Sequence, residues 1–221
     1  MQTSGGGQFE RGADMATRFL LDERNAPAAV RMLTEVAGVF ARQGIRYALT
    51  AGTLLGVVRE GRLLPWDSDM DLSIFAQDAP RFGAAIRELE ASGYIVRLRM
   101  HSRTDHPLVK GTVRILKIWN RRWGMFRGRM LLDCFVKIRY EDAYYWAVGG
   151  EKEYAKKAVP ARFYDRLESI EFSGKRFLVP SDPRGYLALR YGPDWQTPRK
   201  QWNYAKDDGA IIPAGGKSVA P

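Results

Sequence analysis

Cysteine and histidine are scarce in this chain of 221 residues, which contains one cysteine and two histidines. Cys134 has no partner for a disulfide within the chain, which excludes a disulfide-stapled fold. His101 and His106 lie in a polar stretch without further zinc-ligating residues around them, which excludes an ordinary zinc site. This composition is compatible with the cytosol but does not decide the compartment.

Long apolar runs and internal repeats are also absent. No stretch approaches the roughly 18 uninterrupted apolar residues of a membrane-spanning helix, so the sequence predicts none. Residues 1–7, MQTSGGG, are polar and glycine-rich and lack the apolar core of a signal peptide. We therefore expect a cytoplasmic protein, with peripheral attachment at the inner face of the membrane as the alternative.

Acidic residues are fewer than basic ones: the chain contains 25 Asp and Glu residues and 35 Lys and Arg residues, which gives a net charge of +10. This surplus favours anionic partners such as nucleotides, phosphorylated glycans, anionic lipid surfaces or nucleic acid. In the densest basic segment four arginines alternate with two aromatic residues: Arg121, Arg122, Trp123, Phe126, Arg127, Arg129. Such a segment suits a membrane surface or stacking on bases, and equally a solvated hairpin tip.

Apolar periodicity and turn residues predict one mixed α/β or α+β domain around a single sheet. We expect this domain over residues 23–206, between a flexible segment at 1–22 and a flexible tail, rich in Gly, Ala and Pro, at 207–221. The predicted helices cover Ala26–Gln43, Thr53–Arg59, Ala79–Ala91 and Asp182–Gly192. The predicted strands cover Ile45–Thr50, Met70–Phe75, Tyr94–Met100, Thr112–Trp119, Leu131–Ile138 and Tyr144–Val148, with a hairpin over Ile170–Val179.

Asp69 and Asp71 are the most informative residues in the chain. They stand two positions apart at the start of an apolar run, so on a strand both carboxylates share one face. Met70, Leu72 and Ile74 then fall on the opposite face, where they can pack into a core. Two adjacent carboxylates repel each other unless a cation lies between them, and hard oxygen ligands suit Mg²⁺ or Mn²⁺. The pair predicts a divalent-metal site that engages phosphate.

Two further features stand at informative distances from this pair. Gly52 and Thr53 lie between a predicted strand and a predicted helix, where a glycine lets phosphate approach the backbone and a helix N-terminus supplies amide donors. Asp133 is a lone acid within an apolar strand, which is costly unless a cation or a donor compensates it. A metal held jointly with Asp69 and Asp71 would provide that compensation.

The order of strand, Gly-Thr turn, helix, Asp-x-Asp strand and distant third aspartate resembles the nucleotidyltransferase superfamily. Within it, residues 47–72, YALTAGTLLGVVREGRLLPWDSDMDL, resemble the signature block of the LicD family. That family includes bacterial phosphocholine transferases and the fukutin-related phosphotransferases. Residues 186–198, YLALRYGPDWQTP, resemble its C-terminal block. The family usually has a more acidic run after the tryptophan, and Ser68 here replaces one acid, which leaves Asp67 outside the matching pair.

The resemblance implies a nucleotidyltransferase-like mixed β-sheet flanked by helices, with a small C-terminal extension of helix and hairpin. It also implies Mg²⁺- or Mn²⁺-dependent transfer of a phosphocholine- or phosphoribitol-type group from a CDP-activated donor to a sugar hydroxyl of a glycan or glycolipid. Asp69 and Asp71 would hold the metal bound to the diphosphate. Asp133 would complete a second metal site or accept the proton of the acceptor hydroxyl. Gly52 and Thr53 would contact donor phosphate.

Arg59 and Lys117 are further candidates for donor binding. Arg59 follows the short helix and could reach a phosphate, but also fits a surface charge. Lys117 lies in a strand of mixed pattern, where it suits either a phosphate ligand or an edge-strand lysine that discourages aggregation.

Two other functions remain as alternatives. A true nucleotidyltransferase would move a nucleoside monophosphate from a nucleoside triphosphate to a small molecule or RNA, with the same metal chemistry. A non-catalytic module would bind nucleic acid or a membrane through the basic surface. Clustered acids do not help such a module, so we do not expect nucleic acid as a partner.

Overall fold

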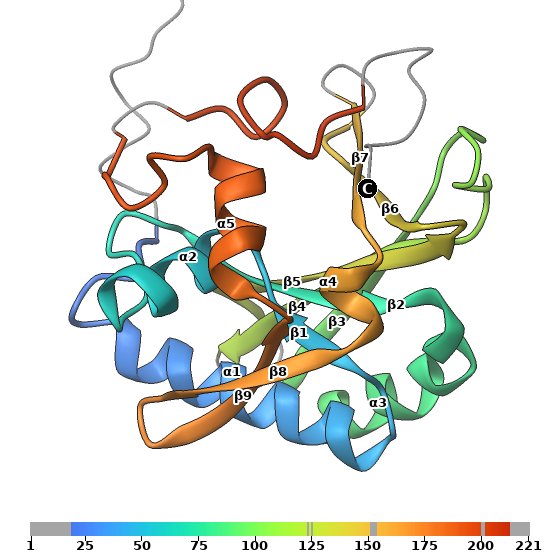
Figure 1. Ribbon diagram of the computed structural model, residues 1–221. Coiled ribbons are helices and arrows are strands. Elements are labelled where there is room, and N and C mark those ends of the chain that lie inside the picture. Colours follow the sequence, from blue (N-terminus) through green and yellow to red (C-terminus); the bar gives the residue numbers. More distant parts are fainter. Residues whose placement is uncertain (1–18, 123, 125, 151–153, 200–201, 213–221) are drawn as a thin grey trace, which may run out of the picture.

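The computed structural model describes residues 19–122, 124, 126–150, 154–199 and 202–212. Its centre is a mixed sheet in which β1, β2, β5, β4 and β3 are neighbours in that order, and β6 and β7 extend it from one end of β5. Strands β2 and β5 run parallel, and the other pairs are antiparallel. Helices α1 and α3 lie together on one side of the sheet, and α5 lies on the other (Figure 1).

The helices are α1 (Ala26–Arg42), α2 (Ala51–Glu60), α3 (Ala79–Ala91), α4 (Arg162–Asp165) and α5 (Pro183–Tyr191), with a 3-10 turn at Ala76–Asp78. The strands are β1 (Tyr47–Leu49), β2 (Asp69–Phe75), β3 (Tyr94–Met100), β4 (Val113–Arg122), β5 (Phe126–Tyr140), β6 (Ala143–Val148), β7 (Ala155–Pro160), β8 (Leu167–Phe172) and β9 (Lys175–Pro180). Strands β8 and β9 form a separate hairpin.

The predicted fold class is confirmed: helices flank a mixed sheet, and a hairpin and a helix follow at the C-terminal end. Three details differ from the sequence-based expectation. Strand β1 is shorter than predicted, and helix α2 begins at Ala51, so Gly52 lies in its first turn rather than before it. Strand β7 and the four-residue helix α4 were not predicted. Strand β4 ends at Arg122 and β5 begins at Phe126, so the arginines of the basic segment lie at the end of this hairpin, while Trp123 lies outside the described residues.

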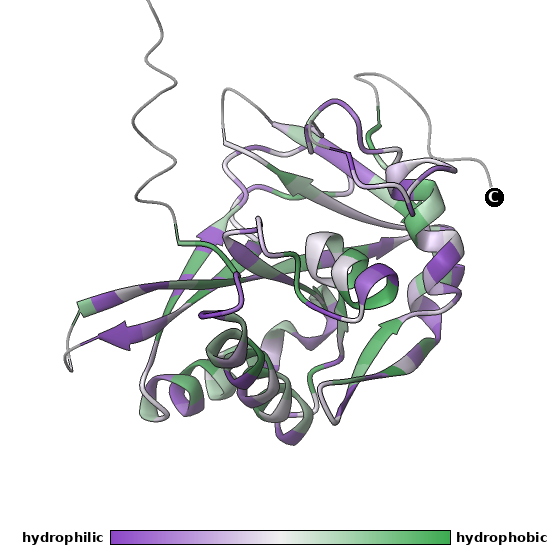
Figure 2. Ribbon diagram, turned by 90° about the vertical axis from the view of Figure 1, so that its left-hand side faces the viewer, coloured by the Kyte–Doolittle hydropathy of each residue, from purple (hydrophilic) through white to green (hydrophobic). Residues whose placement is uncertain are grey.

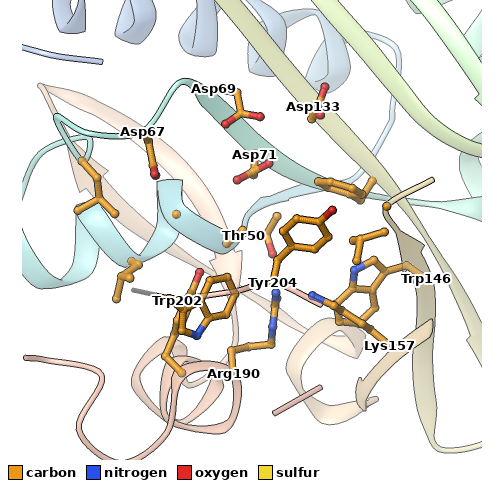
Figure 3. Close-up of a pocket in the computed structure, with 18 of the residues that line it drawn as sticks. Thr50, Asp67, Asp69, Asp71, Asp133, Trp146, Lys157, Arg190, Trp202 and Tyr204 are labelled. Atoms are coloured by element: carbon orange, nitrogen blue, oxygen red, sulfur yellow. The ribbon is translucent and has the colours of Figure 1, made fainter. Parts of the chain in front are cut away.

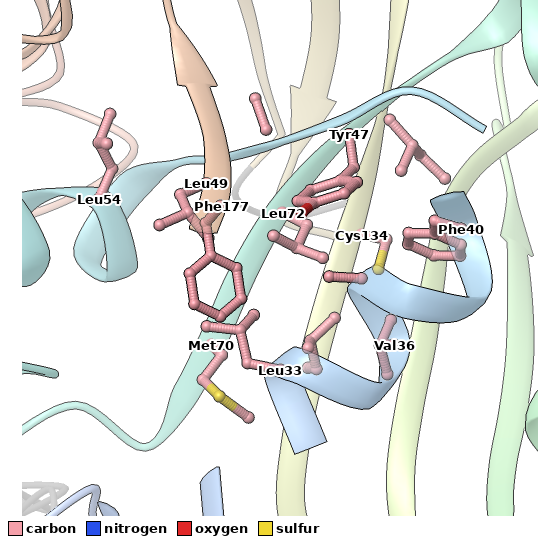
Figure 4. Packing of buried hydrophobic residues seen from close by; sticks show 14 of the residues in the cluster. Leu33, Val36, Phe40, Tyr47, Leu49, Leu54, Met70, Leu72, Cys134 and Phe177 are labelled. Atoms are coloured by element: carbon pink, nitrogen blue, oxygen red, sulfur yellow. The ribbon is translucent and has the colours of Figure 1, made fainter. Parts of the chain in front are cut away.

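The core lies between the sheet and helix α1. Figure 4 shows Leu33, Val36 and Phe40 of α1 facing Leu72 of β2 and Cys134 of β5. All five side chains are buried. Every second residue of β2 and β5 contributes to this face, because strand side chains alternate in direction. The residues between them therefore point to the other side of the sheet, and the carboxylates of β2 and β5 lie on that side.

The two expected flexible ends differ in how much of them the structure describes. Residues 1–18 and 213–221 lie outside the described residues. Leu21 is buried, and its backbone amide donates to the carbonyl of Asp67. Residues 207–212, for which the sequence predicted a loose tail, pack against the domain, with Asp208 and Ala210 buried. Among the described residues, no helix is long and apolar enough to cross a membrane.

Candidate active site

The three predicted aspartates converge on one cavity. Asp71 of β2 is paired in register with Asp133 of β5, and Asp69 lies two residues before Asp71 on the same face. All three line a cavity of about 680 Å³ on the side of the sheet away from α1. Figure 3 shows them close together on one side of this cavity, while Arg190 and Lys157 lie on the opposite side. The sequence spacing and the parallel pairing of β2 with β5 together create this acidic wall.

The carboxylates repel one another strongly at Asp71. Burial raises the pKa of Asp71 well above its usual value, and the neighbouring charges of Asp69, Asp133 and Asp67 raise it further. Asp67, which the sequence placed outside the matching pair, thus belongs to the same cluster and lines the same cavity. A cation between these groups would favour their ionised forms and relieve the repulsion.

Asp133 has a cation beside it already. The Lys117 ammonium lies 2.7 and 2.5 Å from the two carboxylate oxygens of Asp133, and the two residues are cross-strand partners on β4 and β5. Burial still raises the pKa of Asp133, although Lys117 opposes that rise. Lys117 lines the cavity, and β4 is an inner strand, so the edge-strand alternative is wrong; in this arrangement the Lys117 ammonium is bound to Asp133.

Backbone geometry at the start of α2 is unusual. Ala51 has a φ of 47°, in the left-handed region that costs a non-glycine residue about 1–2 kcal/mol. At Gly52 there is no room for a side chain, because a Cβ atom there would lie 2.1 Å from Oδ2 of Asp67. Glycine was expected at this position for the approach of a phosphate. In the structure, the group that approaches it closely is the carboxylate of Asp67.

Thr53 lies behind the cavity wall rather than on it. Its side chain is buried, and its hydroxyl accepts a hydrogen bond of 2.8 Å from the backbone amide of Asp71. The structure therefore gives Thr53 a role different from the predicted contact with donor phosphate: it fixes the position of Asp71 on β2.

Arg59 reaches the cavity from the last turn of α2. Its guanidinium forms an ion pair of 2.6 Å with Glu60 and donates to the backbone carbonyl of Trp195 at 3.4 Å. These contacts hold Arg59 between α2 and the segment that follows α5. The Arg59 side chain is 8% exposed, so it is not a solvated surface charge.

The wall opposite the carboxylates is basic, and sequence reasoning missed it. Lys157 of β7 and Arg190 of α5 lie on this wall, and Lys137 lines the cavity from β5, on the same face of that strand as Asp133; all three are buried. Arg190 donates to both oxygens of Asp208 at 2.6 Å, and Lys157 donates to one of them at 2.5 Å. Lys137 could have been found in the same way as Asp133, as a lone charge in an apolar strand.

The donor set suits a hard divalent cation on the acidic wall, but not one held by protein groups alone. Among the described residues, no group of three or more His, Cys, Asp and Glu side chains is arranged to hold a metal ion. Mg²⁺ is commonly bound by one or two carboxylates, with substrate phosphates and water completing its coordination. Asp69 and Asp71 fit that role, because burial and then the charge of Asp69 raise the pKa of Asp71, and a cation would offset both effects.

Comparison with known families gives a match over most of the folded domain. The family model described as LicD/FKTN/FKRP, nucleotidyltransferase domain, matches residues 44–182, a range that includes all three aspartates. The chain is 43% identical over 195 residues to "Ribitol 5-phosphate transferase FKRP" of Homo sapiens, which covers 79% of this chain and 34% of that protein.

A second curated relative, "Ribitol-5-phosphate transferase FKTN" of Homo sapiens, is 23% identical over 189 residues, covering 85% of this chain and 37% of that protein. The chain thus spans about a third of the length of these two relatives. A crystal structure of ANT(2")-Ia in complex with adenylyl-2"-tobramycin is 15% identical, with a TM-score of 0.42, over 70% of each chain. From the family match and the identity to the first relative, this chain belongs to the LicD/FKTN/FKRP family.

Proposed function

We propose that this protein is a metal-dependent phosphotransferase. It would move a phospho-alcohol group from a CDP-activated donor to a sugar hydroxyl of a glycan. Phosphoribitol is the favoured group, because two curated relatives are named ribitol 5-phosphate transferases. The proposal rests on one observation: Asp69, Asp71 and Asp133 lie together on one wall of a large cavity.

The carboxylates would position the donor. Asp69 and Asp71 would hold Mg²⁺ or Mn²⁺ together with the diphosphate, and Thr53 would keep Asp71 in place through its amide. The bound metal would neutralise charge on the diphosphate and on the leaving CMP. Arg59, at the edge of the cavity, would add a cationic contact to donor phosphate.

Asp133 would act on the acceptor. Its carboxylate shares the cavity with Asp71, and its raised pKa brings it closer to the range in which a general base is effective. Asp133 would accept the proton of the attacking sugar hydroxyl, while Lys117 keeps the carboxylate oriented. Substrate and metal would enter the cavity between the acidic and basic walls.

A donor screen tests this proposal. The protein is incubated with Mg²⁺ and an acceptor extract, separately with CDP-ribitol, CDP-choline, CTP and ATP, and the released nucleotide and pyrophosphate are measured. Release of CMP from a CDP-alcohol supports the proposal. Release of pyrophosphate from a triphosphate, without CMP from either CDP-alcohol, would instead establish a nucleotidyltransferase and refute phospho-alcohol transfer.

If the acceptor is a glycolipid, we propose that the end of the β4–β5 hairpin contacts an anionic membrane. Arg121, Arg122, Arg127 and Arg129 are exposed there, and Phe126 is 62% exposed. Figure 2 shows this hairpin projecting from the body of the domain. Arginines around an exposed aromatic ring suit anionic lipid headgroups. Co-sedimentation with vesicles of anionic lipid, compared with neutral vesicles, tests this contact.

A further inference from the structure

Lys137 is a buried cation that the proposed mechanism does not use. It lies on β5 four residues after Asp133, on the same face of the strand, and its side chain lines the cavity. The residue is 1% exposed. Its ammonium lies 3.0 Å from the centroid of the Trp146 ring and makes no hydrogen bond with any part of the chain that the structure describes. Taking an ammonium out of water is costly unless a partner compensates it.

The surroundings of Lys137 are positively charged. Lys157 and Arg190 line the same part of the cavity, and together with Lys137 they place three cations against the one carboxylate of Asp208. Both carboxylate oxygens of Asp208 already accept hydrogen bonds from Arg190, and one of them also accepts a hydrogen bond from Lys157. Among the described residues, no carboxylate is in contact with the Lys137 ammonium, and the cation–π contact with Trp146 offsets only part of the cost of burial.

The acidic wall does not provide a counter-ion for Lys137. Burial, together with the charges of Arg190 and Lys157, lowers the pKa of Lys137 well below its usual value, and the charges of Asp208 and Asp71 offset only part of that lowering. A bound anion would favour the ionised ammonium. No hydrogen bond joins Asp71 to Lys137 in the described chain. A structural lysine would normally donate to a carboxylate or carbonyl, as Lys157 does.

We propose that Lys137, with Lys157 and Arg190, binds a phosphate group of the substrate at the basic end of the cavity. A phosphate presents several strong acceptor oxygens and a charge that three cations around one carboxylate can balance. The inference deepens the proposed function and rests on it for the identity of the molecule that carries the phosphate. Two sources share this chemistry: the diphosphate of the donor, or a phosphate ester on the acceptor glycan.

Binding of inorganic phosphate tests the site without any turnover. The affinity is measured by calorimetry in phosphate-free buffer without divalent metal, so that the ionised carboxylates cannot bind the anion through a cation. The wild-type protein is compared with Lys137→Met, which keeps a side chain of similar length but removes the charge. Lys156→Met is the matched control, because Lys156 lies beside Lys157 in β7, does not line the cavity and is paired with Asp105.

We expect Lys137→Met to weaken phosphate binding about tenfold or more, as for loss of a charge-assisted hydrogen bond, and Lys156→Met to leave it unchanged. Equal weakening of phosphate binding in both variants would show a general effect of net charge. Wild-type affinity in Lys137→Met would show that Lys137 is not a ligand. Either result overturns the proposal. Thermal unfolding of Lys137→Met should occur at the same or a higher temperature, because a buried charge has been removed. A markedly lower unfolding temperature would reveal a structural role and also overturn it.

A second titration identifies the source of the phosphate. Inorganic phosphate is added to protein saturated with Mg²⁺ and CDP-ribitol. If phosphate still binds, and does so through Lys137, the site belongs to a phosphorylated acceptor; if CDP-ribitol displaces it, the site belongs to the donor. Absence of CMP release from every CDP-alcohol, with phosphate binding still dependent on Lys137, would refute the proposed function and leave this site in place.

Discussion

Lys117 and Asp133 form a two-pronged contact across strands β4 and β5, with the ammonium 2.7 and 2.5 Å from the two carboxylate oxygens. The contact fixes both oxygens of the carboxylate that is proposed to take the acceptor proton. It also sets the basicity of that carboxylate, because burial raises the pKa of Asp133 and Lys117 lowers it. One strand pair therefore controls both the position and the protonation of Asp133.

Replacing Lys117 by Met should shift the pH dependence of turnover. Without the ammonium, the ionised form of Asp133 loses its nearest favourable charge, so the pKa of Asp133 rises. The carboxylate is then protonated at higher pH, and the acidic limb of the rate of CMP release moves to higher pH. The rate is measured against pH, with Lys175→Met, at an exposed lysine of β9, as the control. An acidic limb that stays in place would contradict the role of Asp133 as base.

Replacing Thr53 by Val should lower both stability and activity. The substitution preserves shape but removes the oxygen that accepts the Asp71 amide in a buried position, at a cost of about 1–3 kcal/mol. Asp71 then loses a contact that positions its strand, so turnover falls as well. Urea unfolding and CMP release measure the two effects, and Thr53→Ser, which keeps the hydroxyl, should retain most of both. Equal behaviour of the Val and Ser variants would argue against this hydrogen bond.

Replacing Gly52 by Ala should displace Asp67. The new Cβ atom would lie 2.1 Å from Oδ2 of Asp67, and the carboxylate must move away from the cluster. We expect lower activity and a lower unfolding temperature. Gly83→Ala is the matched control, because a Cβ atom there meets only the Arg87 side chain at 3.6 Å and alanine favours the helix. Wild-type activity of Gly52→Ala would show that the site tolerates a shift of Asp67.

Acid should destabilise the protein through Asp208. Burial alone would raise the pKa of Asp208, but Arg190 and Lys157 outweigh it and hold the pKa at about 2. Because this value is below that of an unfolded aspartate, the contribution is complete above about pH 5 and is lost as the pH falls toward 2, amounting to about 2.5 kcal/mol.

The comparison of wild type with Asp208→Asn isolates this contribution. Urea unfolding at pH 5 should show the variant less stable by several kcal/mol, roughly 3–5, because Arg190 and Lys157 lose their common carboxylate. The difference between the two proteins should narrow at pH 3. A difference that stays constant or widens on acidification would contradict the assignment.

The sequence was sufficient to single out the three aspartates of the acidic wall. Alternation along β2 placed Asp69 and Asp71 on one face, and the cost of a lone acid in an apolar strand singled out Asp133. The parallel pairing of β2 with β5, which brings Asp71 opposite Asp133, could not be derived from local patterns, because register depends on contacts between distant segments. In the sequence analysis, only the assumption of a shared metal ion connected Asp133 with Asp69 and Asp71.

The basic wall was beyond the sequence reasoning for a different reason. Asp208 lies in a stretch rich in Gly and Ala that has the composition of a loose tail, yet it pairs with Lys157, 51 residues earlier. Such a long-range ion pair leaves no local signal. The role of Thr53 was also out of reach, since whether a residue in the first helical turn faces the cavity or β2 depends on how the helix is rotated against the sheet.

The most direct test is the rate of CMP release from CDP-ribitol, with Mg²⁺ and acceptor, by wild type, Asp71→Asn and Asp142→Asn. Asp71 lies at the centre of the carboxylate cluster, whereas Asp142 is exposed in the turn between β5 and β6 and provides the same chemical change away from the site. We predict wild-type turnover in Asp142→Asn and loss of at least about a hundredfold in folded Asp71→Asn, since the amide cannot hold a divalent cation with comparable strength. Retained turnover in Asp71→Asn would contradict the assignment of this cavity as a metal-dependent active site.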